Sequence, residues 1–131
     1  MGQVVKRKQT ILVVDDEEDT LVLMKHKLKE EGFNIQLSPN AENIIDLLTT
    51  DEPDLILLDI HMKGVDGGTI CQLIKTNGST AHIPVVMFSA NDNVAKITSD
   101  CGANGYIKKP FNTGQFKTTF ADIMRPGPVR E

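Results

Sequence analysis

The chain has 131 residues, 40% of them apolar, and a net charge of −4 at neutral pH, which is typical of one globular domain. No apolar run approaches membrane-spanning length, and basic residues are scattered among acidic ones, so neither a membrane segment nor a nucleic-acid surface is indicated. Cys71 and Cys101 lack metal-binding or disulfide-framework spacing and are interpreted as buried small hydrophobic residues of a reducing compartment. We therefore expect a cytoplasmic protein.

The first half of the chain alternates predicted strands and helices. Residues 10–14 form an apolar strand, and the acidic residues after it suit the first turn of a helix. Residues 33–37 alternate apolar and polar side chains, which predicts an outer strand. Ser38 and Pro39 predict the start of a second helix, by capping and by the fixed proline backbone. The apolar run 55–58 predicts a strand that is buried on both faces.

The second half continues the alternation. Asp66 is predicted to cap a third helix whose inward residues are Ile70, Leu73 and Ile74. The remaining elements are expected at residues 83–88 (strand), 93–102 (helix), 105–107 (strand) and in a last helix that ends near residue 124. Five strands that alternate with five helices predict a doubly wound α/β sandwich around a parallel sheet.

The ends of the chain are expected to lie outside the domain. Residues 1–9 are polar and basic and are predicted to be a flexible lead-in. Residues 125–131 contain two prolines and a glycine and are predicted to be a flexible tail. The domain is therefore expected to span residues 10–124.

Polar residues follow the carboxyl ends of four predicted strands, which is the edge where open parallel sheets place their chemistry. They are Asp15 and Asp16 after the first strand, Asp59 after the third, Ser89 after the fourth and Lys109 after the fifth. Clustered carboxylates repel unless one is protonated or a cation lies among them, and such oxygen ligands suit Mg²⁺. An aspartate can be the nucleophile that forms an aspartyl phosphate, and a hydroxyl and an ammonium can bind the phosphoryl group. The pattern predicts phosphoryl transfer onto a carboxylate.

Each of these residues also has an ordinary interpretation. Asp15 and Asp16 can be helix-capping acids at a strand end, and Ser89 can be a turn residue. Lys109 can be a solvated surface lysine, and Tyr106 can be a plain core residue. The joint position of the two acids, the serine and the lysine at one predicted edge favours the functional interpretation.

The motifs at this edge also resemble a known family. They are Asp15-Asp16-Glu17, Asp59-Ile60-His61-Met62 followed by Asp66-Gly67, Ser89-Ala90, and Lys108-Lys109-Pro110-Phe111. In order and spacing they resemble the receiver domains of two-component response regulators, of the stand-alone type, over about residues 10–124. The resemblance implies a flavodoxin-like fold with five parallel strands in the order 2-1-3-4-5. One departure is Lys63, which stands where the family commonly has proline.

The resemblance implies a role for each matching side chain. Asp59 corresponds to the phosphoacceptor, and Ser89 and Lys109 correspond to the hydroxyl and the ammonium that bind the phosphoryl group. Ser89 and Tyr106 correspond to the switch residues. The Lys109–Pro110 bond is expected to be cis.

The resemblance also implies a cofactor and partners. Mg²⁺ is expected on Asp16, Asp59 and the backbone carbonyl of His61, with Asp15 acting through water. The expected phosphoryl donor is a phosphohistidine protein, either a histidine kinase or a histidine phosphotransfer protein. A downstream protein is expected to read the face formed by the fourth helix, the fifth strand and the fifth helix, at about residues 93–124.

The expected function is a phosphorylation-activated signalling receiver that catalyses only its own phosphorylation and dephosphorylation. One alternative is a Mg²⁺-dependent phosphohydrolase with an aspartyl nucleophile. It is disfavoured because such enzymes use a second aspartate two residues on as general acid, and His61 stands there. The other alternative is an interaction module that keeps the fold without phosphorylation, which the loss of one acid or of the lysine would have favoured.

Overall fold

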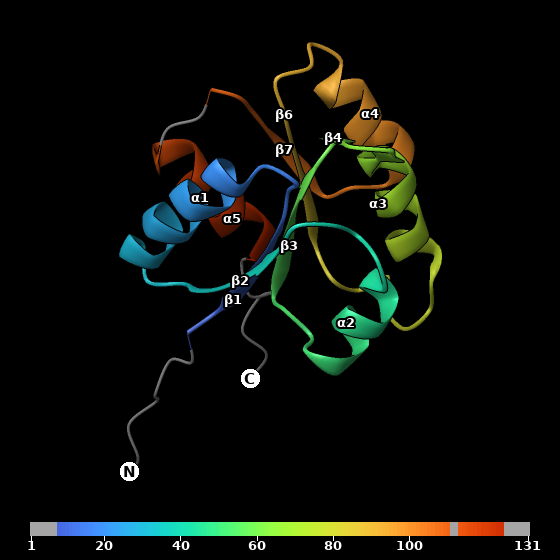
Figure 1. The fold of residues 1–131 in the computed structure, drawn as a ribbon, viewed down its shortest axis with the longest axis horizontal. Helices are drawn as coiled ribbons and strands as arrows, with labels where there is room; N and C mark the ends of the chain where they lie inside the picture. The colour runs from blue at the N-terminus through green and yellow to red at the C-terminus, as the bar shows by residue number, and fades with distance from the viewer. Residues whose placement is uncertain (1–7, 111–112, 125–131) are drawn as a thin grey trace, which may run out of the picture.

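Five apolar segments form one parallel sheet in the computed structural model, which describes residues 8–110 and 113–124. The strands are β1 (Thr10–Val14), β2 (Asn34–Ser38), β3 (Leu55–Asp59), β6 (Val85–Ser89) and β7 (Gly105–Lys108). They lie side by side in the order β2-β1-β3-β6-β7 (Figure 1). Counted along the chain, these five strands have the order 2-1-3-4-5, so the prediction of a flavodoxin-like doubly wound sheet is confirmed.

Helices cover both faces of the sheet. They are α1 (Glu18–Glu30), α2 (Ile44–Thr50), α3 (Gly67–Thr76), α4 (Val94–Cys101) and α5 (Thr113–Met124). Helices α1 and α5 pack on one face, and α2, α3 and α4 pack on the other (Figure 1). Within the described part of the chain, no helix is both long and apolar enough to cross a membrane.

The alternation of side chains along each strand creates two apolar layers, one on each face of the sheet. In β3, Leu55 and Leu57 face α1 and α5, whereas Ile56 and Leu58 face the other three helices. The whole of β3 is buried, as the uninterrupted apolar run predicts. The same alternation places Asp59, two residues after Leu57, on the side of α1 and α5.

The prediction that the second helix starts at Pro39 is wrong, because α2 begins five residues later at Ile44. Ser38 belongs to β2, and its hydroxyl donates a hydrogen bond to the carbonyl oxygen of Asn40. Asn43 then takes a left-handed conformation with φ of 55° directly before the helix, which asparagine tolerates better than most residues.

The third helix begins as predicted, but one of its predicted core residues is exposed. The carboxylate of Asp66 accepts the N–H of Gly68 at 3.1 Å and so caps α3. Leu73, predicted to face inward, is 46% exposed. The inward side of α3 is instead formed by Gly67, Cys71 and Ile74. These positions follow i, i+4 and i+7 spacing, and Leu73 lies about 100° around the helix from Ile74.

A short hairpin follows the end of β3 and was not predicted from the sequence. Its strands are β4 (His61–Met62) and β5 (Val65–Asp66), and they pair antiparallel. Next to it, Gly67 packs so closely on the chain that an added Cβ would lie 2.2 Å from the carbonyl oxygen of Asp59. The hairpin is thereby held against the carboxyl end of β3.

The predicted tail, residues 125–131, and residues 1–7 of the predicted lead-in lie outside the described residues. Both cysteines are buried, as predicted.

Candidate functional site

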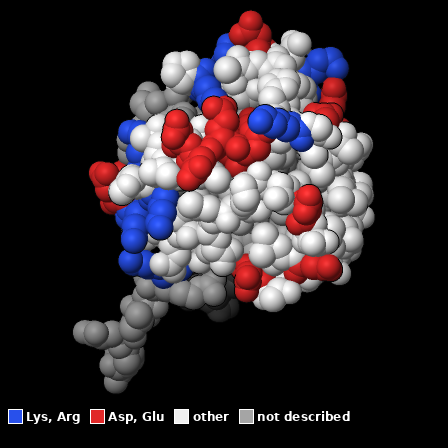
Figure 2. Space-filling model, in the orientation of Figure 1, with Lys and Arg blue, Asp and Glu red and all other residues white. Residues whose placement is uncertain are grey.

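Three carboxylates meet at the carboxyl edge of the sheet. Asp15 and Asp16 follow β1 and Asp59 ends β3, and one oxygen from each lies within 4.8 Å of the others. Asp15 and Asp59 are buried, whereas Asp16 is partly exposed. Figure 2 shows acidic side chains gathered on the upper part of this face, at the end of the sheet where β3 leads into β4. The sequence prediction that the strand-end acids lie together agrees with this geometry.

Lys109 brings one positive charge to the three acids. Its Nζ atom lies 3.7 Å from Asp15 Oδ2 and 3.8 Å from Asp59 Oδ1, and 4.5 Å from the centre of the Phe88 ring. The Lys109 N–H donates to the carbonyl oxygen of Ser89 at 2.8 Å, and the Lys109–Pro110 bond is cis, as predicted. Lys109 is therefore not a solvated surface lysine, and its charge faces the cluster.

The pKa values of the two buried acids follow from their surroundings. Burial and, to a smaller extent, the neighbouring Asp15 together raise the pKa of Asp59 to about 6, while Lys109 acts in the opposite direction. Burial likewise raises the pKa of Asp15. One ammonium does not offset two buried acids that have a third, partly exposed acid beside them.

The donor set fits a hard divalent cation. Asp15 Oδ2 is buried without a hydrogen-bond partner among the described residues, which is costly unless water or an ion meets it. The 4.8 Å spread of the carboxylate oxygens slightly exceeds the about 4.2 Å between opposite ligands of one Mg²⁺. The cluster thus has room for a cation that binds two carboxylates directly and a third through water.

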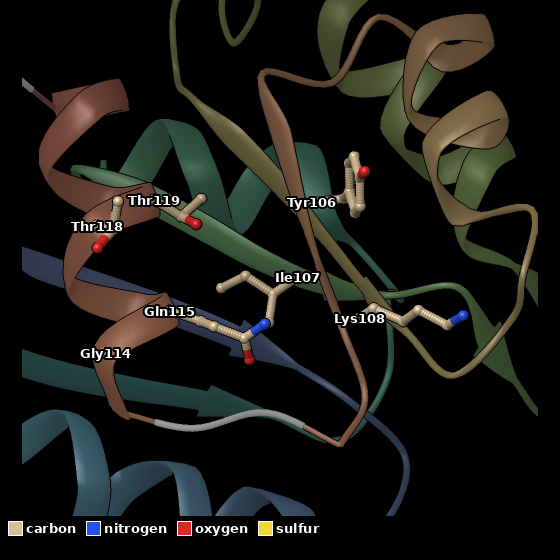
Figure 3. A pocket seen from close by; sticks show the side chains of 7 residues that line it. All are labelled: Tyr106, Ile107, Lys108, Gly114, Gln115, Thr118 and Thr119. Atoms are coloured by element: carbon tan, nitrogen blue, oxygen red, sulfur yellow. The ribbon is translucent and has the colours of Figure 1, made fainter.

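Ser89 ends β6 at the same edge of the sheet as the acids, and Tyr106 lies in β7, where it pairs with Met87, two residues before Ser89. Ser89 is buried, and its hydroxyl accepts the N–H of Asn91 at 3.0 Å. Tyr106 is 43% exposed, so the interpretation of Tyr106 as a plain core residue is wrong. In Figure 3, Tyr106 and Lys108 point away from α5, whereas Ile107 points toward it, into a groove of about 480 Å³ between β7 and α5.

Two contacts at the mouth of the site were missed by sequence reasoning. The Asn91 side chain lies 3.1 Å from Nε2 of His61, joining the loop after β6 to the loop after β3. The backbone N–H of Lys63 donates to Asp16 Oδ2 at 2.7 Å. The two-residue spacing from Ser89 is common for local side-chain to backbone bonds and could have indicated the bond from the Asn91 N–H to Ser89 Oγ, but not the contact with His61. The Lys63 contact has no comparable signal, because it depends on the unpredicted hairpin.

We expect the stability of the metal-free protein to fall as the pH rises from about 4 to about 7. The folded pKa of Asp59, about 6, lies above the about 3.9 of an unfolded aspartate. The folded chain therefore holds a proton that the unfolded chain releases, and the stability this proton contributes is lost as Asp59 ionises. The loss is at most about 3 kcal/mol at 1.36 kcal/mol per pKa unit.

Thermal unfolding in EDTA across this pH range tests the prediction, with Asp59→Asn as the reference. The amide of the variant does not titrate, so its melting temperature is expected to fall less than that of the wild type. Parallel curves for the two proteins would show that Asp59 has an ordinary pKa.

The fold and the site together define a small α/β protein with an acidic pocket at the carboxyl edge of its sheet. The model of the response regulator receiver domain matches residues 11–121, and the chain belongs to this family, a signalling module of two-component systems. The resemblance seen in the sequence motifs is thereby confirmed.

Solved structures of similar proteins agree with this assignment. A two-component response regulator from Clostridium difficile has 27% identity and a TM-score of 0.80, with 93% of this chain and 100% of that chain covered. Chemotaxis protein CheY4 of Vibrio cholerae has 18% identity and a TM-score of 0.80, with coverages of 89% and 99%. The receiver domain of sensor histidine kinase PA1611 from Pseudomonas aeruginosa has 20% identity, a TM-score of 0.82 and coverages of 92% and 100%. That structure has a magnesium ion coordinated in its active site cleft.

Proposed function

We propose that this chain is a phosphorylation-controlled receiver that accepts a phosphoryl group on Asp59. The observation that carries the proposal is the placement of the Lys109 ammonium 3.7 and 3.8 Å from two buried carboxylates, Asp15 and Asp59, at an edge with surplus negative charge. A structural ion pair requires one acid, whereas this arrangement places two acids beside one ammonium and a third acid within 4.8 Å of those two. A phosphoryl group and a divalent cation would complete it.

In the proposed reaction, a carboxylate oxygen of Asp59 attacks the phosphorus of a phosphohistidine. The oxygen–phosphorus bond forms as the phosphorus–nitrogen bond breaks, and the electron pair of the broken bond stays on the imidazole of the donor. Asp59 attacks only in its deprotonated form. A folded pKa of about 6 leaves most of the carboxylate ionised at neutral pH.

Lys109 and Ser89 are the side chains proposed to receive the phosphoryl oxygens. The Lys109 ammonium, held by both Asp15 and Asp59 before the reaction, would pair with the new negative charge. The Ser89 hydroxyl, which accepts a backbone N–H, retains its own hydrogen to donate. Ser89 ends β6, the strand next to β3, and Lys109 directly follows β7, so the phosphoryl group would join the end of β3 to the ends of β6 and β7.

Asp16, Asp59 and the backbone carbonyl of His61 are proposed to hold Mg²⁺, with Asp15 acting through water. When bound, Mg²⁺ supplies positive charge to the phosphoryl oxygens and offsets the repulsion among the acids. The absence of a hydrogen bond to the buried Asp15 Oδ2 among the described residues and the close spacing of the carboxylates support this assignment.

The proposed donor is a histidine kinase or a histidine phosphotransfer protein, in the cytoplasm. The proposed readout is the face formed by α4, β7 and α5, with Tyr106 as the switching residue. The half-exposed Tyr106 side chain supports this proposal, because an inward turn would change the surface. We propose that the functional unit spans residues 10–124.

Incubation with Mg²⁺ and acetyl phosphate, followed by intact-mass measurement, tests the proposed function. We expect the gain of one phosphoryl group, and transfer from a histidine-phosphorylated donor protein with release of its unmodified histidine. Sustained turnover of small phosphomonoesters would instead support a phosphohydrolase. No mass gain from either donor would favour an unphosphorylated interaction module.

Asp16→Asn is expected to abolish most of the increase in melting temperature that Mg²⁺ causes in the wild type. If Mg²⁺ binds only the folded protein, it raises the free energy of unfolding by mass action. The increase is about 2.7 kcal/mol when the Mg²⁺ concentration is about 100 times the dissociation constant. An amide oxygen is a weaker Mg²⁺ ligand than a carboxylate because it carries no net charge. The matched control is Asp19→Asn, an exposed acid of α1. An unchanged Mg²⁺ response in Asp16→Asn would refute the role of Asp16.

A further inference from the structure

The turn of the β4–β5 hairpin reaches the acidic cluster through one backbone group. The N–H of Lys63 donates to Asp16 Oδ2 at 2.7 Å, although 47 positions separate the two residues in the sequence. This distance is at the short end of the range for N–H···O bonds, as charged acceptors favour. The backbone amide makes this contact, while the Lys63 side chain is exposed.

The hairpin holds this amide in a fixed position relative to Asp59. Met62, the residue before Lys63, buries its side chain in the apolar layer of α2, α3 and α4. After the hairpin, the N–H of Gly67 donates to the carbonyl oxygen of Ile60 at 2.7 Å. The turn itself has only two residues, Lys63 and Gly64, between the paired residues Met62 and Val65. The Lys63 amide therefore has little freedom to move away from the site.

Asp16 is the member of the cluster that most needs such a restraint. Asp15 and Asp59 are buried, whereas Asp16 is partly exposed. Repulsion from the two buried acids favours any rotamer that turns the Asp16 carboxylate toward water. The bond from Lys63 opposes that rotation. A carboxylate has about four lone-pair sites, so one amide leaves the others available to a cation.

We propose that Lys63 is a positioning residue of the metal site, because its amide holds the Asp16 carboxylate toward Asp15 and Asp59 and so strengthens Mg²⁺ binding. The inference rests on the proposed binding of Mg²⁺ by Asp16 and Asp59. If the inference is right, the Mg²⁺ affinity depends on the backbone N–H at position 63 and not on the side chain there. Any residue except proline would supply this N–H.

The turn is well suited to testing this dependence. Gly64 has φ of 69°, and among the described non-glycine residues only Asn43 has positive φ, so φ of Lys63 is negative. This combination belongs to a type II turn, which accepts proline at its first central position. The preceding Met62 lies in a strand, the conformation that a following proline requires. Proline can therefore remove the N–H while the turn is retained.

The experiment compares Lys63→Pro with Lys63→Ala, because both variants lack the ammonium and they differ in the amide. Mg²⁺ affinity is measured by calorimetry, and the melting temperature is measured in EDTA. Lys63→Ala is expected to bind Mg²⁺ about as tightly as the wild type, since it keeps the backbone amide and changes only an exposed side chain. Lys63→Pro is expected to bind Mg²⁺ at least about tenfold more weakly than Lys63→Ala. Losses of this size are typical when a group that donates a hydrogen bond to a metal ligand is removed.

Each result decides the inference. Equal Mg²⁺ affinities of the two variants, with a difference only in the EDTA melting temperature, would show a purely structural bond and overturn it. A wild type that does not bind Mg²⁺ would overturn the proposed metal site together with it. If Lys63→Pro does not fold, hydrogen exchange of the Lys63 amide in the wild type is measured with saturating Mg²⁺. If the Lys63 amide stays protected from exchange when Mg²⁺ is bound, the bond to Asp16 persists in the metal-bound state, which supports the inference. If the amide loses its protection when Mg²⁺ binds, the inference is overturned.

Discussion

Asp59→Asn is expected to fold and to accept no phosphoryl group from acetyl phosphate in the presence of Mg²⁺. The substitution keeps the shape of the side chain and leaves the buried strand β3 intact, but it replaces the nucleophilic carboxylate oxygen by an amide. It also removes one of three clustered negative charges, so the variant is expected to be more stable than the wild type in EDTA at neutral pH. Intact mass after incubation with the phosphodonor measures the loss, which is expected to be complete.

The matched control for this variant is Asp51→Asn, the same change at an exposed acid that follows α2. It is expected to take up one phosphoryl group as the wild type does. A phosphorylated Asp59→Asn protein, with the group mapped by peptide sequencing to another acid, would show that Asp59 is not the phosphoacceptor. Loss of uptake in both variants would show that the assay responds to acidic charge rather than to one residue.

The edge that carries the acids could be predicted because strand ends are local features of the sequence. Short apolar runs end abruptly on polar residues, and the parallel arrangement brings their carboxyl ends together. The alternation of side chains also predicts the side on which each residue lies. Asp15 and Asp59 stand two residues after Val13 and Leu57, and these two apolar residues share one layer.

Helix boundaries and exposed faces were predicted less well, because they depend on contacts that are distant in sequence. Ser38-Pro39 has the residue types of a helix start, yet pairing of Ser38 with Val14 keeps it in β2. Leu73 has suitable spacing, but the close packing of Gly67 on β3 rotates α3 so that Cys71 and Ile74 face the sheet. Both errors arise where tertiary packing overrides a local preference.

The site was predicted as a set of residues, but its internal geometry could not be. The sequence does not indicate that Lys109 lies between two acids, since that position depends on the chain path after β7. The amide of Lys63 is equally invisible, because every residue except proline has an N–H. Side-chain types thus indicate where chemistry occurs, while backbone donors emerge only with the fold.

The route from the site to the surface is suggested by the pairing of β6 with β7. Met87 pairs with Tyr106 and Ser89 pairs with Lys108. Met87 belongs to the apolar layer of α2, α3 and α4, so Ser89, two residues on, faces the same side, and Figure 3 shows Tyr106 and Lys108 pointing away from α5. A movement of Ser89 toward a phosphoryl group on Asp59 would therefore open space on the side where Tyr106 lies.

Ser89→Ala is expected to accept a phosphoryl group at Asp59 but to lose the accompanying change at α4, β7 and α5. A ligand shifts a two-state equilibrium only by its differential affinity for the two states. The Ser89 hydroxyl is the group that would bind the phosphoryl oxygens after moving, and a hydrogen bond to a charged group contributes about 1.5–3 kcal/mol. Its removal is expected to lower the ratio of switched to unswitched protein by roughly tenfold or more.

Amide hydrogen exchange with and without beryllofluoride, a phosphoryl mimic, measures this coupling in the wild type, Ser89→Ala and Ser89→Thr. The wild type is expected to change its protection in α4, β7 and α5, and Ser89→Ala is expected to show little change there. Ser89→Thr retains a hydroxyl and is the matched control, because it keeps the acceptor for the Asn91 N–H as well as the donor. A wild-type change confined to α1 and α2 would show that the signal leaves by another face. A full change in Ser89→Ala would show that Lys109 alone couples the phosphoryl group to Tyr106.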